Sequence, residues 1–166
     1  MYNSKTNYFN VQEDKCTKLL KEFNENLQWF KGLTANTRGS EIDFKGTDKK
    51  DRLVHIEHKQ RKGKIDDFFK YGDILIEPGK ICAFTKIMES GHSNDEQTLY
   101  INYTDDGVII FDLNKIASMN FYPNHRQINY GKKQYEHEHR FGLPMKDAII
   151  YKKDETGNYI RYKQWA

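Results

Sequence analysis

The residue types with the clearest chemical potential are two acids and a lysine in one short region. Asp43 is an isolated acid in an apolar stretch, and residues 52–61, RLVHIEHKQR, end an apolar run with Glu57 and Lys59. Two carboxylates are hard oxygen ligands that suit Mg²⁺, and a nearby lysine can orient or deprotonate an attacking water and offset phosphate charge. Metal ions that activate water are a common route to phosphodiester hydrolysis. These three residues therefore predict metal-dependent hydrolysis, provided that the fold brings them together.

Strand geometry allows that convergence. In an extended strand Glu57 and Lys59 point to the same face, about 7 Å apart. Asp43 lies on the face opposite Ile42 and Phe44 of the preceding strand. If the two strands pair, the three polar side chains meet on one patch. The competing interpretation is a solvated sheet face with cross-strand ion pairs.

The acid-x-lysine triplet is not distinctive on its own, because the chain contains it four times. Only Glu57-His58-Lys59 ends an apolar strand, with an isolated strand acid 14 residues upstream and a helix before that. The position of this triplet in the chain, rather than the triplet itself, favours a catalytic role.

The element that precedes these strands is predicted to be an amphipathic helix at 11–30. Its apolar residues recur at helical spacing and form one stripe; they are Cys16, Leu19, Leu20, Phe23 and Leu27. A polar turn at 31–40, a strand at 41–46, a charged turn and a strand at 52–60 follow. Together they predict a hairpin beside the helix.

The rest of the chain reads as mostly β-structure. The predicted elements are a short helix at 64–72, two strands around Pro78-Gly79, a hairpin around 105–107, a helical segment at 114–122 and later strands with a hairpin at 155–158. This order predicts an α+β fold, with a helix on one face of a mostly antiparallel or mixed sheet.

Length and charge indicate one soluble domain. The chain has 166 residues and a formal charge of +3, which permits nucleic-acid binding without demanding it. Cys16 and Cys82 lack metal or CxxC spacing and suggest a reducing compartment. Neither a signal peptide nor a membrane-spanning run is apparent, so a cytoplasmic (intracellular) protein without a membrane partner is expected.

The order helix, strand with Asp43, turn, and strand ending Glu57-x-Lys59 resembles the core of the PD-(D/E)XK nuclease superfamily. That superfamily includes restriction enzymes, phage and archaeal Holliday-junction resolvases, and recombination exonucleases. The resemblance covers about residues 11–76, with Ile42 in place of the nominal proline. It implies a restriction-endonuclease-like mixed sheet flanked by helices. It also implies that Asp43 and Glu57 bind Mg²⁺, which Mn²⁺ could replace, and that Lys59 is catalytic.

Several members of that superfamily add a glutamate on the first helix. At about 100° per residue, Glu13 lies about 60° from the centre of the apolar stripe, Glu22 about 115° away and Glu25 nearly opposite. The string QEDKC around Glu13 also resembles the start of this helix in phage junction resolvases. Glu13 is therefore the predicted fourth acidic residue, as a metal ligand or through water.

Several basic and polar residues near the acids could contact nucleic acid; these are Arg38, Gln60, Arg61, Lys62 and Lys64. Ordinary surface charge is an equal alternative for each of the four cations, while uncharged Gln60 could touch a base or the backbone. Farther along, His125, His137 and His139 permit a zinc interpretation, although an HxH pair without further ligands is weak. Interleaved aromatic and basic residues at 124–135 favour nucleic-acid contact more.

These observations predict a single nuclease domain over 1–166, with a catalytic core at about 11–76 and a β-rich C-terminal extension at about 77–166. The predicted activity is Mg²⁺-dependent endonucleolytic cleavage of DNA, by a homodimer. Two alternatives stay open: a nucleic-acid-binding module of the same fold without catalysis, and an endoribonuclease.

Overall fold

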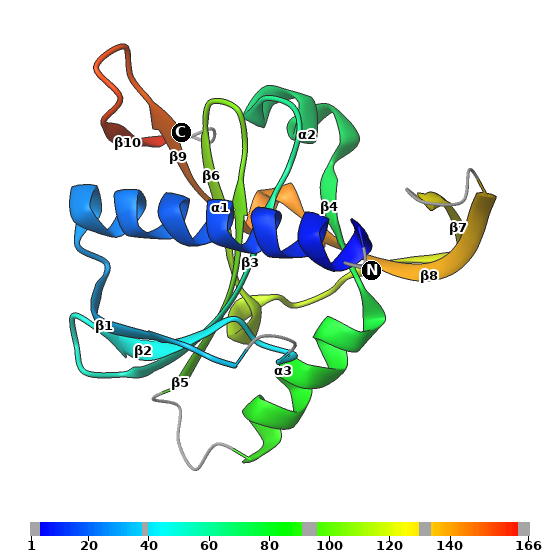
Figure 1. Ribbon diagram of the computed structural model, residues 1–166, viewed down its shortest axis with the longest axis horizontal. Coiled ribbons are helices and arrows are strands. Elements are labelled where there is room, and N and C mark those ends of the chain that lie inside the picture. The colour runs from blue at the N-terminus through cyan, green and yellow to red at the C-terminus, as the bar shows by residue number, and fades with distance from the viewer. Residues whose placement is uncertain (1–3, 38–39, 91–95, 130–133, 163–166) are drawn as a thin grey trace.

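A seven-stranded mixed sheet forms the centre of the molecule, with helices on both faces (Figure 1). The computed structural model describes residues 4–37, 40–90, 96–129 and 134–162. The helices are α1 (Ser4–Leu27), α2 (Ile65–Tyr71) and α3 (Pro78–Ser90), with short 3₁₀ turns at Leu113–Lys115 and Met145–Asp147. The strands of the large sheet are β1 (Phe30–Ala35), β2 (Phe44–Asp48), β3 (Leu53–Gln60), β5 (Glu96–Tyr103), β6 (Gly107–Asp112), β9 (Ile149–Lys153) and β10 (Tyr159–Tyr162).

Strands β1, β2 and β3 form an antiparallel meander. In the β2–β3 hairpin, Phe44 pairs with Ile56 and Lys45 with His55. The turn is closed by Asp48, whose Oδ1 accepts hydrogen bonds from the backbone N–H groups of Lys50 and Arg52, at 2.8 and 2.9 Å. This register places the residue before β2, Asp43, beside the second half of β3.

Strand β5 lies parallel to β3, with Leu53 opposite Glu96 and Gln60 opposite Tyr103. Parallel neighbours need a crossover connection, and here it contains α2, α3 and the short strand β4 (Asp73–Ile76). Strands β6, β9 and β10 continue the sheet in antiparallel fashion beyond β5. The parallel partner of β3 therefore lies outside the predicted core at 11–76.

Each face of the sheet buries its own hydrophobic core. On one face Cys16, Leu20 and Phe23 of α1 pack against alternate strand residues such as Ile56 and Ile101. On the other face α2 and α3 cover the side chains that point the opposite way, Tyr100 and Phe111 among them. Successive side chains of β5 and β6 point to opposite faces of the sheet and so enter the two cores in turn. Every residue is buried in the segments 98–103 and 107–112.

A second, three-stranded antiparallel sheet has the order β4-β8-β7, with β7 at Asn120–Asn129 and β8 at Gln134–Pro144. Figure 1 shows β7 and β8 extending away from the body of the molecule. None of the helices in the described segments is long and apolar enough to cross a membrane.

The α+β class is confirmed, as are the first helix, the short second helix and the hairpins β2–β3, β5–β6 and β9–β10. Three local predictions are wrong. Residues 30–35 form edge strand β1 rather than a turn, the segment after Pro78 is helix α3, and 114–122 ends in strand β7 rather than a helix.

These errors have physical reasons. Strand β1 buries only Phe30, so it lacks an alternating pattern. Proline is well tolerated at the first position of a helix, and Ala83 and Phe84 fit the buried face of α3. Pro78-Gly79 therefore begins a helix instead of a turn between strands.

Candidate active site

The structure brings Asp43 and Glu57 together at the start of β2. The backbone N–H of Asp43 donates to the carbonyl of Ile56 at 3.0 Å, which fixes Asp43 against β3. Its carboxylate Oδ2 accepts a hydrogen bond from the backbone N–H of His58 at 2.9 Å. The antiparallel register, with Phe44 opposite Ile56, sets Asp43 beside Glu57, and the Asp43 carboxylate acts electrostatically on the Glu57 carboxyl group. Two acids from neighbouring chain segments thus share one site.

Glu57 is buried, with 7% of its surface exposed. Burial first, and then the neighbouring Asp43 carboxylate, raise the pKa of Glu57 from 4.5 to about 8. Among the described residues, its Oε2 atom has no hydrogen-bond partner. A buried carboxyl group next to a second one is costly to ionise without a compensating cation.

Lys80 supplies one such cation. This residue of the first turn of α3 places its Nζ 2.8 Å from Glu57 Oε1, and the same ammonium group donates to the carbonyl of Glu41 at 2.8 Å. Lys80 lowers the pKa of Glu57, but burial and Asp43 outweigh it. The lysine that touches the acid pair therefore comes from the helix after β4 and not from the acid-x-lysine triplet.

Lys59 is on the same strand face as Glu57 but binds a different acid. Its Nζ lies 2.7 Å from Oε1 of Glu77, the residue before α3, and both side chains are partly exposed. Burial would raise the pKa of Glu77, but the Lys59 ammonium outweighs that effect and the pKa lies below its ordinary value. The sequence-based alternative of a simple Glu57–Lys59 ion pair is thus not the arrangement observed.

Glu13 has the predicted phase on α1. It is half-buried, one turn before buried Cys16, whereas Glu25 is exposed. The Cys16 thiol forms a hydrogen bond with the backbone of Gln60, so this part of α1 lies over the end of β3. The described residues contain no group of three or more His, Cys, Asp or Glu side chains that could hold a metal ion. Glu13 is therefore near the end of β3 but does not join the acid pair in one ligand cluster.

Several further buried polar atoms lack hydrogen-bond partners among the described residues. In the described part of the chain, such buried atoms are Oε2 of Glu57, both ring nitrogens of His58, Nδ2 of Asn102 and the Tyr103 hydroxyl. His58 packs between the rings of Phe44 and Tyr103, with centroids 5.3 and 5.9 Å away. Unpaired buried polar groups cost stability. Of these atoms, His58 Nε2 faces the acid pair, 3.7 Å from Oδ2 of Asp43.

The acid pair fits Mg²⁺ in chemistry. Mg²⁺ prefers oxygen ligands and is usually held through one or two protein carboxylates while it keeps several waters. Asp43 and Glu57 supply two such carboxylates, and the unpaired Oε2 atom of Glu57 can accept a cation. The nitrogen and sulfur ligands that characterise zinc sites are not required for this arrangement.

The other predicted contact residues divide into groups. Lys62 and Lys64 are exposed near the end of β3, and Gln60 is half-buried. Arg61 is held internally, since its guanidinium donates to Asn102 Oδ1 and to the Tyr100 hydroxyl at 3.0 and 2.7 Å. The structure thus uses Arg61 to join β3 to β5 rather than to present a free cation. Arg38 lies outside the described residues.

His139 is the histidine of the second sheet whose side chain the structure describes. His139 is exposed and its ring lies 5.6 Å from that of Phe121. The side chains of His125 and His137 lie outside the described part of the structure. The zinc interpretation is therefore unsupported by any described contact.

Lys80 and Glu77 are the site residues that sequence reasoning missed. Both flank Pro78-Gly79, which was interpreted as a turn between two strands. Pro78 followed by apolar residues three apart, Ile81, Phe84 and Ile87, would have indicated a helix with Glu77 just before it and Lys80 in its first turn.

Replacing Glu13 by Gln is expected to slow cleavage substantially, whereas Glu25→Gln should leave it unchanged. Glu13 is half-buried on the face of α1 that covers β3, and Glu25 is exposed. Both variants remove one negative charge from the same helix, so Glu25→Gln is a matched control in a single-turnover cleavage assay. Equal rates for the two variants would show that the position of Glu13 on the sheet-facing side of α1 gives it no special part in the reaction.

The raised pKa of Glu57 predicts a loss of stability at higher pH in the metal-free protein. Between 4.5 and about 8 the folded protein retains a proton that the unfolded chain has released. Folding therefore takes up a proton, and the free energy of unfolding falls as pH rises through that window. Glu57→Gln lacks this dependence, and from about pH 5 to pH 8.5 it should gain on the order of 4 kcal/mol relative to the original protein.

Urea denaturation with EDTA at a series of pH values measures this difference. Parallel pH profiles for Glu57→Gln and the unaltered protein would show that Glu57 ionises normally in the fold.

Comparison with known proteins adds no name to this site. No protein-family model matches the chain, and neither a curated protein nor a solved structure matches it. The function is therefore inferred from the arrangement of the residues in the site.

Proposed function

We propose that this protein is a Mg²⁺-dependent nuclease of the PD-(D/E)XK type that cuts DNA internally. The observation that carries the proposal is the placement of Asp43 beside Glu57 by the β2–β3 register; burial and the Asp43 carboxylate raise the pKa of Glu57 to about 8. Such a pair is stabilised by a divalent cation. A mixed sheet with helices on both faces is also what the family resemblance implies.

Each residue has a defined part in this proposal. Asp43 and Glu57 would hold the metal, which when bound polarises a phosphate oxygen and lowers the pKa of water. Asp43 is oriented by the backbone N–H of His58, and Glu57 by the ammonium group of Lys80. Glu13 would assist through a bound water rather than as a direct ligand.

Lys59 would orient the attacking water and offset charge on the scissile phosphate. Its contact with Glu77 fixes the amine near the C-terminal end of β3, the strand that also carries Glu57. Because both partners are partly exposed, the amine is accessible to a substrate. Lys62 and Lys64 are exposed nearby and would contact the phosphate backbone.

One observation favours the alternative of a binding module without catalysis. Lys80 is paired with Glu57 and Lys59 with Glu77, so both lysines near the acids already have acidic partners. In a purely structural site these ion pairs would need no metal. Nucleic-acid binding without cleavage in the presence of Mg²⁺ would support this second function.

A cleavage panel distinguishes these possibilities. Supercoiled plasmid, linear duplex, single-stranded DNA, a four-way junction and RNA are incubated with the protein in Mg²⁺ or EDTA. Internal cleavage of DNA only with Mg²⁺ is the expected result. Cleavage of RNA alone would replace the DNA assignment with the endoribonuclease alternative.

Two further parts of the proposal concern the protein in solution. A homodimer would place two sites on the two strands of a duplex, and an intracellular location fits a DNA substrate. Analytical ultracentrifugation with and without duplex DNA tests the dimer.

A further inference from the structure

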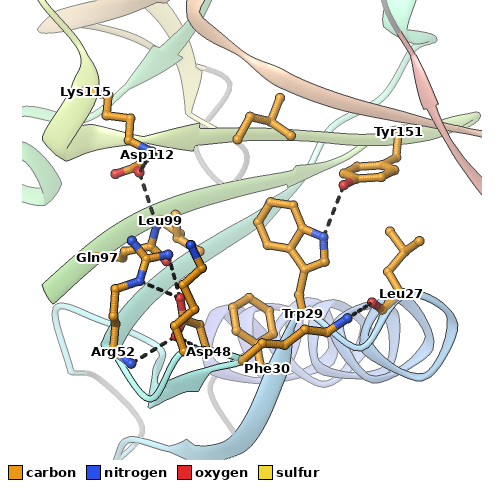
Figure 2. Close-up of a pocket in the computed structure, with 13 residues that line it drawn as sticks. Leu27, Trp29, Phe30, Asp48, Arg52, Gln97, Leu99, Asp112, Lys115 and Tyr151 are labelled. Atoms are coloured by element: carbon orange, nitrogen blue, oxygen red, sulfur yellow. Dashed lines mark hydrogen bonds and ion pairs between the residues drawn. The ribbon is translucent and has the colours of Figure 1, made fainter. Parts of the chain in front are cut away.

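A second hollow lies at the other end of the β2–β3 hairpin from the acid pair. It has a volume of about 440 Å³ and is bounded by the end of α1, the β2–β3 turn and the sheet residues Gln97, Leu99 and Tyr151. Figure 2 shows these side chains around one opening. The volume is within the range of small-molecule sites in proteins.

One wall of this pocket is aromatic and fixed in place. The Trp29 indole N–H donates to the Tyr151 hydroxyl at 3.2 Å, and the two rings meet edge to face with centroids 5.8 Å apart (Figure 2). Trp29 also packs against Phe23 and Phe30, at 5.6 and 6.1 Å between ring centroids. A rigid indole at the edge of a hollow is suited to stacking with a planar ring.

The pocket also carries positive charge. Two of its cations are neutralised by buried acids, since Arg52 Nη2 lies 2.6 Å from Asp48 and Lys115 Nζ lies 3.0 Å from Asp112. Lys49 and Lys50 also line the pocket, and among the described residues neither forms an ion pair with an acid; Lys49 Nζ donates to the backbone carbonyl of Leu27 at 3.3 Å. The lining therefore has two positive charges in excess.

This combination favours one class of ligand. A phosphate monoester carries a charge of about −1.5 to −2 at neutral pH, which the two lysines balance. A purine or pyrimidine ring matches the aromatic wall, and the Gln97 side-chain amide can exchange hydrogen bonds with a base edge. An apolar ligand would leave the excess charge uncompensated, and inorganic phosphate would leave the aromatic wall unused.

We infer that the pocket between Trp29, Tyr151 and Lys50 binds a mononucleotide, with its base on Trp29 and its phosphate at Lys49 and Lys50. This inference goes beyond the proposed nuclease activity, because the pocket shares none of its lining residues with the acid pair. A mononucleotide has no internucleotide bond to cleave, so its binding can be measured separately from catalysis.

Calorimetry in EDTA with adenosine, guanosine, cytidine and uridine 5′-monophosphates tests the inference, with adenosine and inorganic phosphate as incomplete ligands. Saturable binding of at least one monophosphate is expected, at least about tenfold tighter than either incomplete ligand. Intrinsic fluorescence of a Trp165→Phe variant, in which Trp29 is the remaining tryptophan, should be quenched with the same dissociation constant.

Lys50→Glu should weaken this binding by about tenfold or more, because it replaces attraction to the phosphate by repulsion. Lys21→Glu, the same charge change at an exposed position of α1 that does not line the pocket, should change it less than about twofold. Unfolding midpoints of both variants confirm that they are folded.

Three results would overturn the inference. One is the absence of saturable binding for every monophosphate up to about 10 mM, a concentration about tenfold above a dissociation constant of about 1 mM. Another is equal binding by Lys50→Glu and Lys21→Glu. The third is binding of a 5′-phosphorylated oligonucleotide but of no mononucleotide, which would make the pocket a site for strand ends.

Discussion

Lys59→Met is expected to lower the rate of DNA cleavage by at least about 10²-fold while Mg²⁺ binding survives. The change removes the amine that orients water and offsets phosphate charge, but it leaves both carboxylates in place. Loss of a nearby positive charge should keep Mg²⁺ affinity unchanged or increase it. Calorimetry with Mg²⁺ or Mn²⁺ and a single-turnover cleavage assay on the same preparation measure both quantities.

A structural role for Lys59 predicts a different result. Its ion pair with Glu77 joins two partly exposed side chains, 42% and 36% exposed, and such pairs contribute about 0–1 kcal/mol to stability. In that case Lys59→Met would change the unfolding free energy slightly and leave turnover unaltered. Lys70→Met, at a side chain that is 78% exposed on α2, is the matched control and should have no effect on rate. An unchanged rate in Lys59→Met would remove this lysine from the mechanism.

Asp43→Ala is expected to abolish both cleavage and Mg²⁺ binding while the protein stays folded. Without a metal the Asp43 carboxylate disfavours ionisation of Glu57, and it is one cause of the raised pKa of Glu57. Removing Asp43 should therefore bring the pKa of Glu57 closer to its ordinary value, and the thermal stability of the metal-free protein should hold or rise. Calorimetry, thermal denaturation in EDTA and the cleavage assay check these expectations.

Asp43→Asn provides the control for the loss of a hydrogen bond. In the structure the Asp43 carboxylate accepts from the backbone N–H of His58, and an asparagine carbonyl oxygen can accept the same bond. Asp43→Asn should therefore lose activity like Asp43→Ala while it keeps this contact. Cleavage at the original rate in either variant would show that Asp43 is not part of the site.

Local patterns in the sequence were sufficient to predict the parts of the fold that depend on neighbouring residues. The apolar stripe of α1 holds buried Cys16, Leu20 and Phe23 as expected, because helical periodicity is a local property. The β2–β3 hairpin follows from two short strands and a charged turn. It brings Asp43 to Glu57, the contact on which the candidate site depends.

The partners of the two lysines could not be predicted in the same way. Glu77 and Lys80 reach the site because α3 begins at Pro78 and the crossover to β5 places that helix end beside β3. This arrangement results from a parallel strand pairing between segments about 40 residues apart, which leaves no local pattern. The internal role of Arg61 has the same origin, since its partners Tyr100 and Asn102 are on β5.

The measurement that tests the central proposal most directly is the conversion of supercoiled plasmid to nicked and linear forms by the purified protein. We expect conversion with Mg²⁺ or Mn²⁺, none in EDTA, and none by Asp43→Ala at the same concentration with or without metal. Circular dichroism of both proteins confirms that they are folded. A folded protein that leaves the plasmid intact with either metal, or an Asp43→Ala variant that cuts as fast as the original, would contradict the assignment of a metal-dependent DNA endonuclease.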